Sequence, residues 1–253
     1  FRVLTLGAIA LAAALVATNL TLRGVSPDLV ISQVYGGGGN SGAPYRNDFV
    51  EIFNRGSAAV SLTGKSVQYA SATGTGNFGA NPVTALSGTL QPGQHYLVQL
   101  AGGANGVALP TPDATGTVNM SGSAGKVALV NSTTGLACNG GSTTCSPAQL
   151  ALIVDLVGYG NANFYEGAGS AATLSNTTAA FRAGGGCQDT DANSADFAAG
   201  APAPRNTASS YLYCSGPTDP SGNGVALPAS VDAGAGSLLT VTVIPGANPP
   251  STG

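Results

Sequence analysis

The stretch from Leu29 to Asn54, LVISQVYGGGGNSGAPYRNDFVEIFN, contains two strand-like runs on either side of a glycine-rich loop. The consecutive glycines Gly36–Gly39 permit positive φ angles and predict a tight or mobile loop. In the second run, Phe49–Asn54, apolar and polar residues alternate. Both phenylalanines therefore share a face with Glu51, while the valine and the isoleucine point to the other face. A carboxylate among aromatic residues needs a donor, which the Asn-Arg-Gly turn after the strand can supply.

The rest of the chain repeats this pattern of short strands and turns. With 38 Gly and 15 Pro, and no long helical period after the N-terminal region, the composition favours strands over helices. The most hydrophobic run, Leu150–Tyr159, predicts a central strand buried on both faces. The other strand candidates are Leu29–Tyr35, Phe49–Asn54, Ala58–Leu62, Ser66–Ala70, His95–Leu100, Lys126–Val130 and Ser237–Ile244. We therefore expect an all-β sandwich or barrel.

Charged residues are scarce in this chain. They make up 8% of the residues, the formal net charge is −3, and only eight are Lys or Arg. Because affinity for a phosphate backbone comes from clustered cations, we expect no direct nucleic-acid binding. The glycine motif at 74–79 fits G-x-G-x-x-G, but Asn81 and Pro82 follow where a helix should begin. We interpret it as a loop, since the phosphate-binding mechanism requires a helix N-terminus.

The N-terminus has the composition of an export signal. Arg2 precedes an apolar run, Val3–Val16, and small residues crowd the end of that run. The run is too short to span a membrane, so we expect cleavage near Ala14 or Ala17 and no membrane span afterwards. An alternative is a pilin-like subunit, although Thr5 stands where such subunits usually carry Glu. The export signal predicts a secreted protein, extracellular or at the cell surface.

Cysteine usage agrees with export. The four cysteines are Cys138, Cys145, Cys187 and Cys214. Three pairings are possible, and proximity in the sequence favours 138–145 and 187–214. The first would close a turn-forming loop, and the second would tie a late segment back to the body. Each closed loop would contribute about 2–4 kcal/mol. A metal site is the weaker alternative, because the spacing is not Cys-x-x-Cys.

One acidic cluster has the spacing of a metal loop. Asp189, Asp191 and Asn193 present oxygens at alternate positions, and Asp196 follows, which is how a calcium loop supplies its ligands. The cluster departs from the helical calcium loop because Ser194 replaces the turn glycine and no Glu stands at position twelve. The alternative is a set of Asx turns in which the side chains accept hydrogen bonds from their own backbone. Calcium is the one cofactor that the sequence suggests.

Two further polar residues lie in predicted strands. Asp155 sits in an apolar run and, if buried, needs a cation that Arg182 or Arg205 could provide. His95 begins a strand, and no Ser or Cys in a nucleophile-elbow context accompanies it. We therefore predict a surface histidine at a strand edge rather than a general base. We predict no catalytic residue in this chain.

Three motifs in a fixed order carry a family resemblance. They are the Leu29–Asn54 stretch, VSLTGKSVQY at Val60–Tyr69, and LQPG at Leu90–Gly93 leading into YLVQ at Tyr96–Gln99. Together they resemble the lamin-tail domain over about residues 29–206. The resemblance implies an immunoglobulin-like β-sandwich that bacteria fuse to secreted proteins. In many bacterial members this domain lies upstream of a nuclease or phosphoesterase unit.

The expected organisation has three parts. Residues 1–24 are a signal-like segment, residues 25–214 a β-sandwich of the lamin-tail type, and residues 215–253 a linker with the start of a further β segment. We expect a non-catalytic extracellular accessory or interaction module, covalently linked to a downstream domain and able to bind a protein, glycan or cell-surface ligand. One alternative is a structural subunit of a surface layer or fibre that assembles through sheet edges. Another is part of an extracellular nuclease that contributes to its site.

Overall fold

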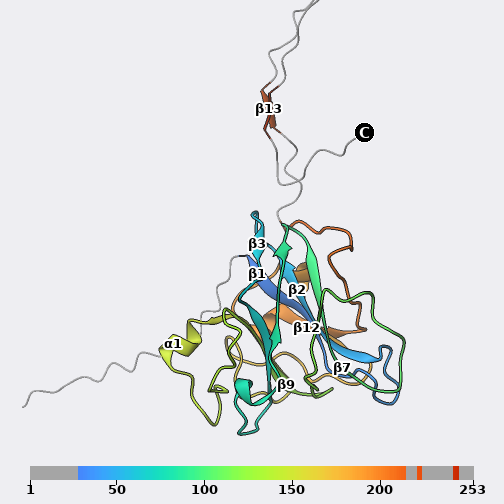
Figure 1. Cartoon of the computed structure of the whole chain (residues 1–253), viewed down its shortest axis with the longest axis vertical. Coiled ribbons are helices and arrows are strands. Elements are labelled where there is room, and N and C mark those ends of the chain that lie inside the picture. Colours follow the sequence, from blue (N-terminus) through green and yellow to red (C-terminus); the bar gives the residue numbers. More distant parts are fainter. Residues whose placement is uncertain (1–27, 215–220, 224–241, 245–253) are drawn as a thin grey trace, which may run out of the picture.

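Two β-sheets pack face to face in the computed structural model, which describes residues 28–214, 221–223 and 242–244 (Figure 1). The larger sheet has six strands in the order β12 (Phe197–Gly200), β11 (Ala179–Arg182), β1 (Leu29–Tyr35), β2 (Asn47–Asn54), β7 (His95–Gly102) and β8 (Ala114–Thr115). The smaller sheet has four strands in the order β10 (Ile153–Tyr159), β9 (Gly125–Val130), β4 (Ser66–Ser71) and β5 (Thr84–Ala85). Neighbouring strands are antiparallel except for the parallel pair β7–β8.

Smaller elements complete the described part of the chain. Two short strand pairs form, β3 (Val60–Ser61) with β6 (Thr89–Leu90) and β13 (Ser221–Asn223) with β14 (Thr242–Ile244). The short helices are η1 (Phe78–Ala80), α1 (Pro147–Leu150), η2 (Ala183–Gly186) and α2 (Asn193–Asp196). The architecture is the predicted all-β immunoglobulin-like sandwich.

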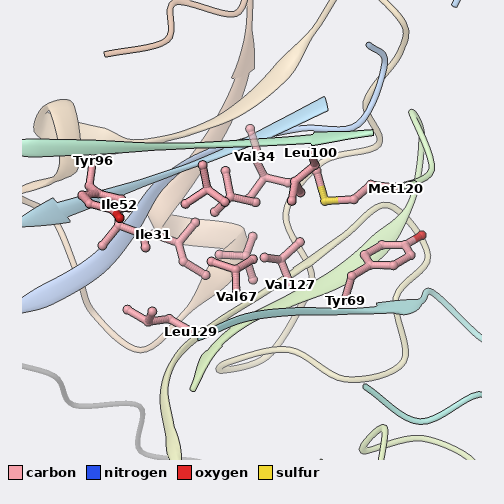
Figure 2. Packing of buried hydrophobic residues seen from close by; sticks show 14 of the residues in the cluster. Ile31, Val34, Ile52, Val67, Tyr69, Tyr96, Leu100, Met120, Val127 and Leu129 are labelled. Carbon is pink, nitrogen blue, oxygen red and sulfur yellow. The ribbon is translucent and has the colours of Figure 1, made fainter. Parts of the chain in front are cut away.

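The main core lies between the two sheets. Side chains of β1, β2 and β7 face those of β4 and β9 (Figure 2). Val50 and Ile52 of β2 belong to this core, whereas Phe49 packs on the opposite face with Tyr35 and Leu97. The predicted division of β2 into two faces is therefore confirmed, and it follows from the two-residue period of a strand.

The glycine-rich loop after β1 is tight rather than open. A Cβ on Gly38 would lie 2.0 Å from the carbonyl carbon of Asn47, and Gly39 has a φ of +71°. Glycine is required at both positions because no side chain fits the first and the second is left-handed. The loop thus packs its backbone directly against the start of β2.

The predicted strand Leu150–Tyr159 is wrong at its start and in its position. Leu150 is instead the last residue of α1, and a turn follows at 151–152. The helix forms because Ser146 and Gln149 make a reciprocal capping box and Pro147 occupies the first turn. The strand begins at Ile153, and it ends the four-stranded sheet rather than lying in its centre. It is still buried, because its outer edge lies against β1, where the Ile31 N–H donates to the Asp155 carboxylate.

Some predictions fall outside the described residues. The signal-like segment 1–24 lies outside them, as does most of 215–253. Of the predicted strand Ser237–Ile244, only Thr242–Ile244 is described, as β14. Within the described part of the chain, no helix is long and apolar enough to cross a membrane.

Candidate functional site

A buried arginine lies at the junction of the two sheets. Arg182, the last residue of β11, has a fully buried side chain whose Nη2 contacts the two Asp155 carboxylate oxygens at 2.9 and 2.8 Å. Its Nε donates to the Ile31 carbonyl at 2.9 Å, and its guanidinium stacks 4.5 Å from the centre of the Phe197 ring. The predicted cation for Asp155 is therefore Arg182. The pair joins β10 to β11, that is, one sheet to the other.

Two of the predicted calcium ligands converge on the same guanidinium. Nη1 of Arg182 lies 2.9 Å from Asp189 and 3.6 Å from Asp196. Asp189 also lies 3.6 Å from the guanidinium of Arg55. Burial raises the pKa of Asp196, but hydrogen bonds from Thr190 and its neighbours outweigh burial and lower that pKa overall. The cation that faces both carboxylates is therefore a guanidinium. A calcium site would place a metal ion in that position.

The other two predicted ligands have different surroundings. Asn193 turns toward β10, where it accepts from the Gly158 N–H at 2.8 Å and donates to the Leu156 carbonyl at 2.9 Å. Asp191 has a left-handed backbone with a φ of 54°. Among the described residues, no group of three or more His, Cys, Asp or Glu side chains is arranged to hold a metal ion. Calcium binding stays a prediction, and this geometry favours the alternative of local turns.

We expect the melting temperature of the chain to be the same in calcium and in chelator. The reason is that the Arg182 guanidinium already lies against Asp189 and Asp196, so a metal ion would have to displace it. Thermal melts of the parent and of Asp191→Asn in both buffers test this. A calcium site would instead stabilise the parent by about 2.7 kcal/mol at a hundredfold excess over Kd, and a shift of that size would restore the calcium interpretation.

A further acidic residue beside this cluster escaped the sequence analysis. Glu166 is fully buried, and its Oε2 accepts from Asn193 Nδ2 at 3.2 Å. Burial, together with the nearby Asp155 charge, raises the pKa of Glu166 to about 10, so it carries a proton at neutral pH. It lies in a turn-rich stretch with no hydrophobic period, and no signal in the sequence could have marked it as buried.

Glu51 takes its donors from elsewhere than predicted. Its carboxylate accepts from Ser32 Oγ at 2.6 Å, and from the backbone N–H and Nη2 of Arg205 at 2.7 Å each. The turn after β2 contributes none of these bonds. Glu51 lies in the middle of β2, so its neighbours are the adjacent strand and a segment that crosses the sheet, while the turn lies beyond the strand end.

The prediction that His95 is a surface histidine is wrong. His95 is 1% exposed, and its ring stacks on Phe53 with 4.6 Å between centroids. Burial, and to a smaller extent Arg205, lowers the pKa of His95 to about 4 despite the opposing effect of Glu51. The imidazole is therefore neutral at pH 7. Residues near 205 in the sequence cover this strand end, which a local pattern at position 95 could not indicate.

A surface hollow of about 550 Å³ lies between the two arginine sites. Its lining includes the aromatic rings of Tyr45 and Phe181 and the partly exposed Arg205. The hollow is open to solvent, whereas the carboxylates that the arginines bind are buried. The side chains of Arg182 and Arg205 thus extend from the hollow to the buried carboxylates of Asp155 and Glu51.

Both predicted disulfides form. Cys138 bonds to Cys145, and Cys187 bonds to Cys214 across 27 residues of sequence. The first pair is buried in a small apolar cluster with Phe78. The second is reachable from solvent, because Cys214 is exposed.

Comparison with known proteins identifies a family and a similar solved structure. A family model described as Lamin Tail Domain matches residues 24–160, a segment that ends before β11. A solved structure, the crystal structure of a DUF4876 family protein from Bacteroides thetaiotaomicron VPI-5482, is similar with 12% identity and a TM-score of 0.45. The similarity covers 73% of this chain and 74% of that one. No curated protein sequence matches the chain.

Proposed function

This chain belongs to the lamin tail domain family, a non-catalytic immunoglobulin-like fold, and from that membership we propose its function. We propose that it is a non-catalytic extracellular accessory or interaction module of a larger secreted protein, such as a nuclease or phosphoesterase. Its partners are then a covalently linked domain and a ligand on a protein, glycan or cell surface.

The observation that carries the proposal is the state of the buried carboxylates. Asp48, Glu51 and Asp155 are the acidic side chains that the described strands bury. Asp48 accepts from the backbone N–H groups of Gly38 and Met120 at 2.8 Å each, whereas Glu51 and Asp155 are each bonded to a guanidinium at 2.7–2.9 Å. Both are 0% exposed, so a substrate in solvent does not reach them. A general acid or base must lie within hydrogen-bond reach of the proton that it transfers. Asp155 serves instead to join the two sheets through Arg182, and Glu51 joins β2 to the segment around Arg205.

Two further features support an extracellular location. The two disulfides are of the kind that persists in oxidising compartments. The N-terminal residues have the charge and apolar pattern of an export signal. Export also agrees with the family resemblance, because bacteria fuse domains of this family to secreted proteins.

We expect the purified chain to hydrolyse neither plasmid DNA nor a simple phosphate ester in magnesium, manganese or calcium. The assay is conversion of supercoiled to nicked plasmid, with colorimetric release from the ester in parallel. Asp189→Ala is the matched variant, because Asp189 is the outermost of the carboxylates around Arg182. Metal-dependent nicking that this variant abolishes would contradict the proposal and favour a nuclease site.

A further inference from the structure

A late segment of the chain crosses the face of the six-stranded sheet that is turned away from the main core. We call residues 201–214 the strap. It passes over β1 and β2, where Gln33 and Glu51 bond it, and reaches the start of β7, where Gln94 Nε2 donates to the Thr207 carbonyl at 2.9 Å. At its far end the Leu212 N–H donates to the Gly93 carbonyl at 2.8 Å.

The sheet holds the strap in the manner of a bound peptide. The side-chain amide of Gln33 bonds both backbone groups of Ala203, accepting from its N–H and donating to its carbonyl, each at 2.9 Å. The Arg205 N–H donates to Glu51 at 2.7 Å. The side chain of Asp113 accepts from the Thr207 N–H at 3.1 Å. Residues 203, 205 and 207 of the strap are thus bonded through their backbone, and Pro202 beside them is buried.

The sequence of the strap suits this alternation. Residues 201–204 read Ala-Pro-Ala-Pro, so proline, which has no N–H, occupies the positions on either side of the bonded Ala203. Proline also fixes φ near the value of an extended polyproline conformation, which lowers the entropy lost on binding. A segment of this kind is preorganised for a groove that reads every second residue.

One side chain of the strap adds specificity. The Arg205 guanidinium donates to both Glu51 oxygens, at 2.7 and 3.2 Å, and Glu51 is fully buried. A fork-to-fork contact of this kind distinguishes arginine from lysine or an uncharged residue. Gln33, Glu51, Gln94 and Asp113 form what we call the strap groove.

We propose that the strap groove is a peptide-recognition site for an extended Pro-x-Pro-Arg segment, which the chain's own strap fills, and that the Cys187–Cys214 disulfide latches the strap in place. The proposal deepens and rests on the proposed interaction function, because it names the class of partner: a protein with an exposed proline- and arginine-bearing segment. Opening the latch would let such a segment replace the strap.

The position of the disulfide suits a latch. The strap is continuous with β12 at one end and, at the other, is covalently tied to the body through Cys214. Since Cys214 is exposed and the Cys138–Cys145 pair is buried, a small thiol should reduce the latch first. One thiolate attacks a latch sulfur to form a mixed disulfide and release a protein thiolate. A second thiol then releases the other cysteine, so two thiols become one disulfide and the latch becomes two thiols.

The test is binding of a labelled peptide to the full chain. The peptide has the sequence of residues 201–207, Ala-Pro-Ala-Pro-Arg-Asn-Thr, and its control carries Gln in place of Arg. We expect the oxidised chain not to bind, and Cys187→Ser with Cys214→Ser to bind the Arg peptide at least tenfold more tightly than the Gln peptide. Hydrogen exchange of the Ala203 and Arg205 amides should increase in that variant.

A rescue experiment covers the case in which the strap stays in its groove without the latch. When Arg205→Gln is added to the Cys187→Ser and Cys214→Ser chain, the groove keeps Glu51 but loses its guanidinium, so the Arg peptide should raise the melting temperature and the Gln peptide should not. Arg46→Gln, at an exposed arginine, is the matched control and should respond to neither.

Each result decides one part of the proposal. Equal binding of both peptides, or no binding and no rescue in either variant, would overturn the recognition site. Binding to the oxidised chain as tight as to the opened one, or unchanged amide exchange without the latch, would overturn the latch. None of these outcomes touches the absence of hydrolysis that tests the accessory function, so the two proposals fail separately.

Discussion

Replacing Arg182 with methionine is expected to destabilise the folded chain by about 3–5 kcal/mol. The substitution keeps much of the side-chain length but removes the cation from Asp155, a fully buried carboxylate, and from the neighbouring Asp189 and Asp196. Breaking a buried pair by removing one partner costs this much because the remaining charge has lost both water and its counter-ion. Denaturant unfolding followed by circular dichroism measures the change.

Two controls separate charge from packing. Arg46→Met, at an exposed arginine, should change the stability by less than about 0.5 kcal/mol. Arg182→Met combined with Asp155→Leu should recover part of the loss, because it removes both members of the closest pair. A single substitution that costs less than 1 kcal/mol would show that Arg182 does not hold the two sheets together.

A chain that ends at Gly160, where the family match ends, is expected not to fold cooperatively. It keeps Glu51 and Asp155 but lacks Arg205 and Arg182, which bind them. Each buried charge left without its partner costs about 3–5 kcal/mol, and a whole domain is stable by only about 5–15 kcal/mol. The shorter chain also lacks β11, the neighbour of β1, so β1 would become an open edge.

The matched control is a chain that ends at Cys214, which keeps both arginines and both disulfides. It should melt like the full chain, with one cooperative transition and dispersed amide signals in a proton–nitrogen spectrum. If the chain that ends at Gly160 shows the same cooperative transition, the sandwich folds without residues 161–214. If it does not, those residues are part of the folding unit.

Local patterns in the sequence predicted much of the sandwich. The two-residue alternation of β2 assigned its faces correctly, and β1 has the predicted bounds. The spacing of Cys138 and Cys145 indicated the right pairing, since nearby cysteines meet at low entropic cost. Asp155 could be recognised as needing a cation because a carboxylate in an apolar strand has few other ways to be stable.

Only the tertiary structure decided where the polar side chains of the site meet. Arg205 and Glu51 are 154 residues apart, and no local pattern indicates that the strap crosses β2. His95, which the sequence alone presented as a surface residue, is buried against Phe53, and the strap bonds to Gly93 and Gln94 just before it. Of the residues with calcium-like spacing, Asp189 and Asp196 converge, and the cation that they meet depends on β11, which carries Arg182. Periodicity and spacing reflect forces within a few residues, whereas sheet order and the neutralisation of buried charge depend on segments brought together only by folding.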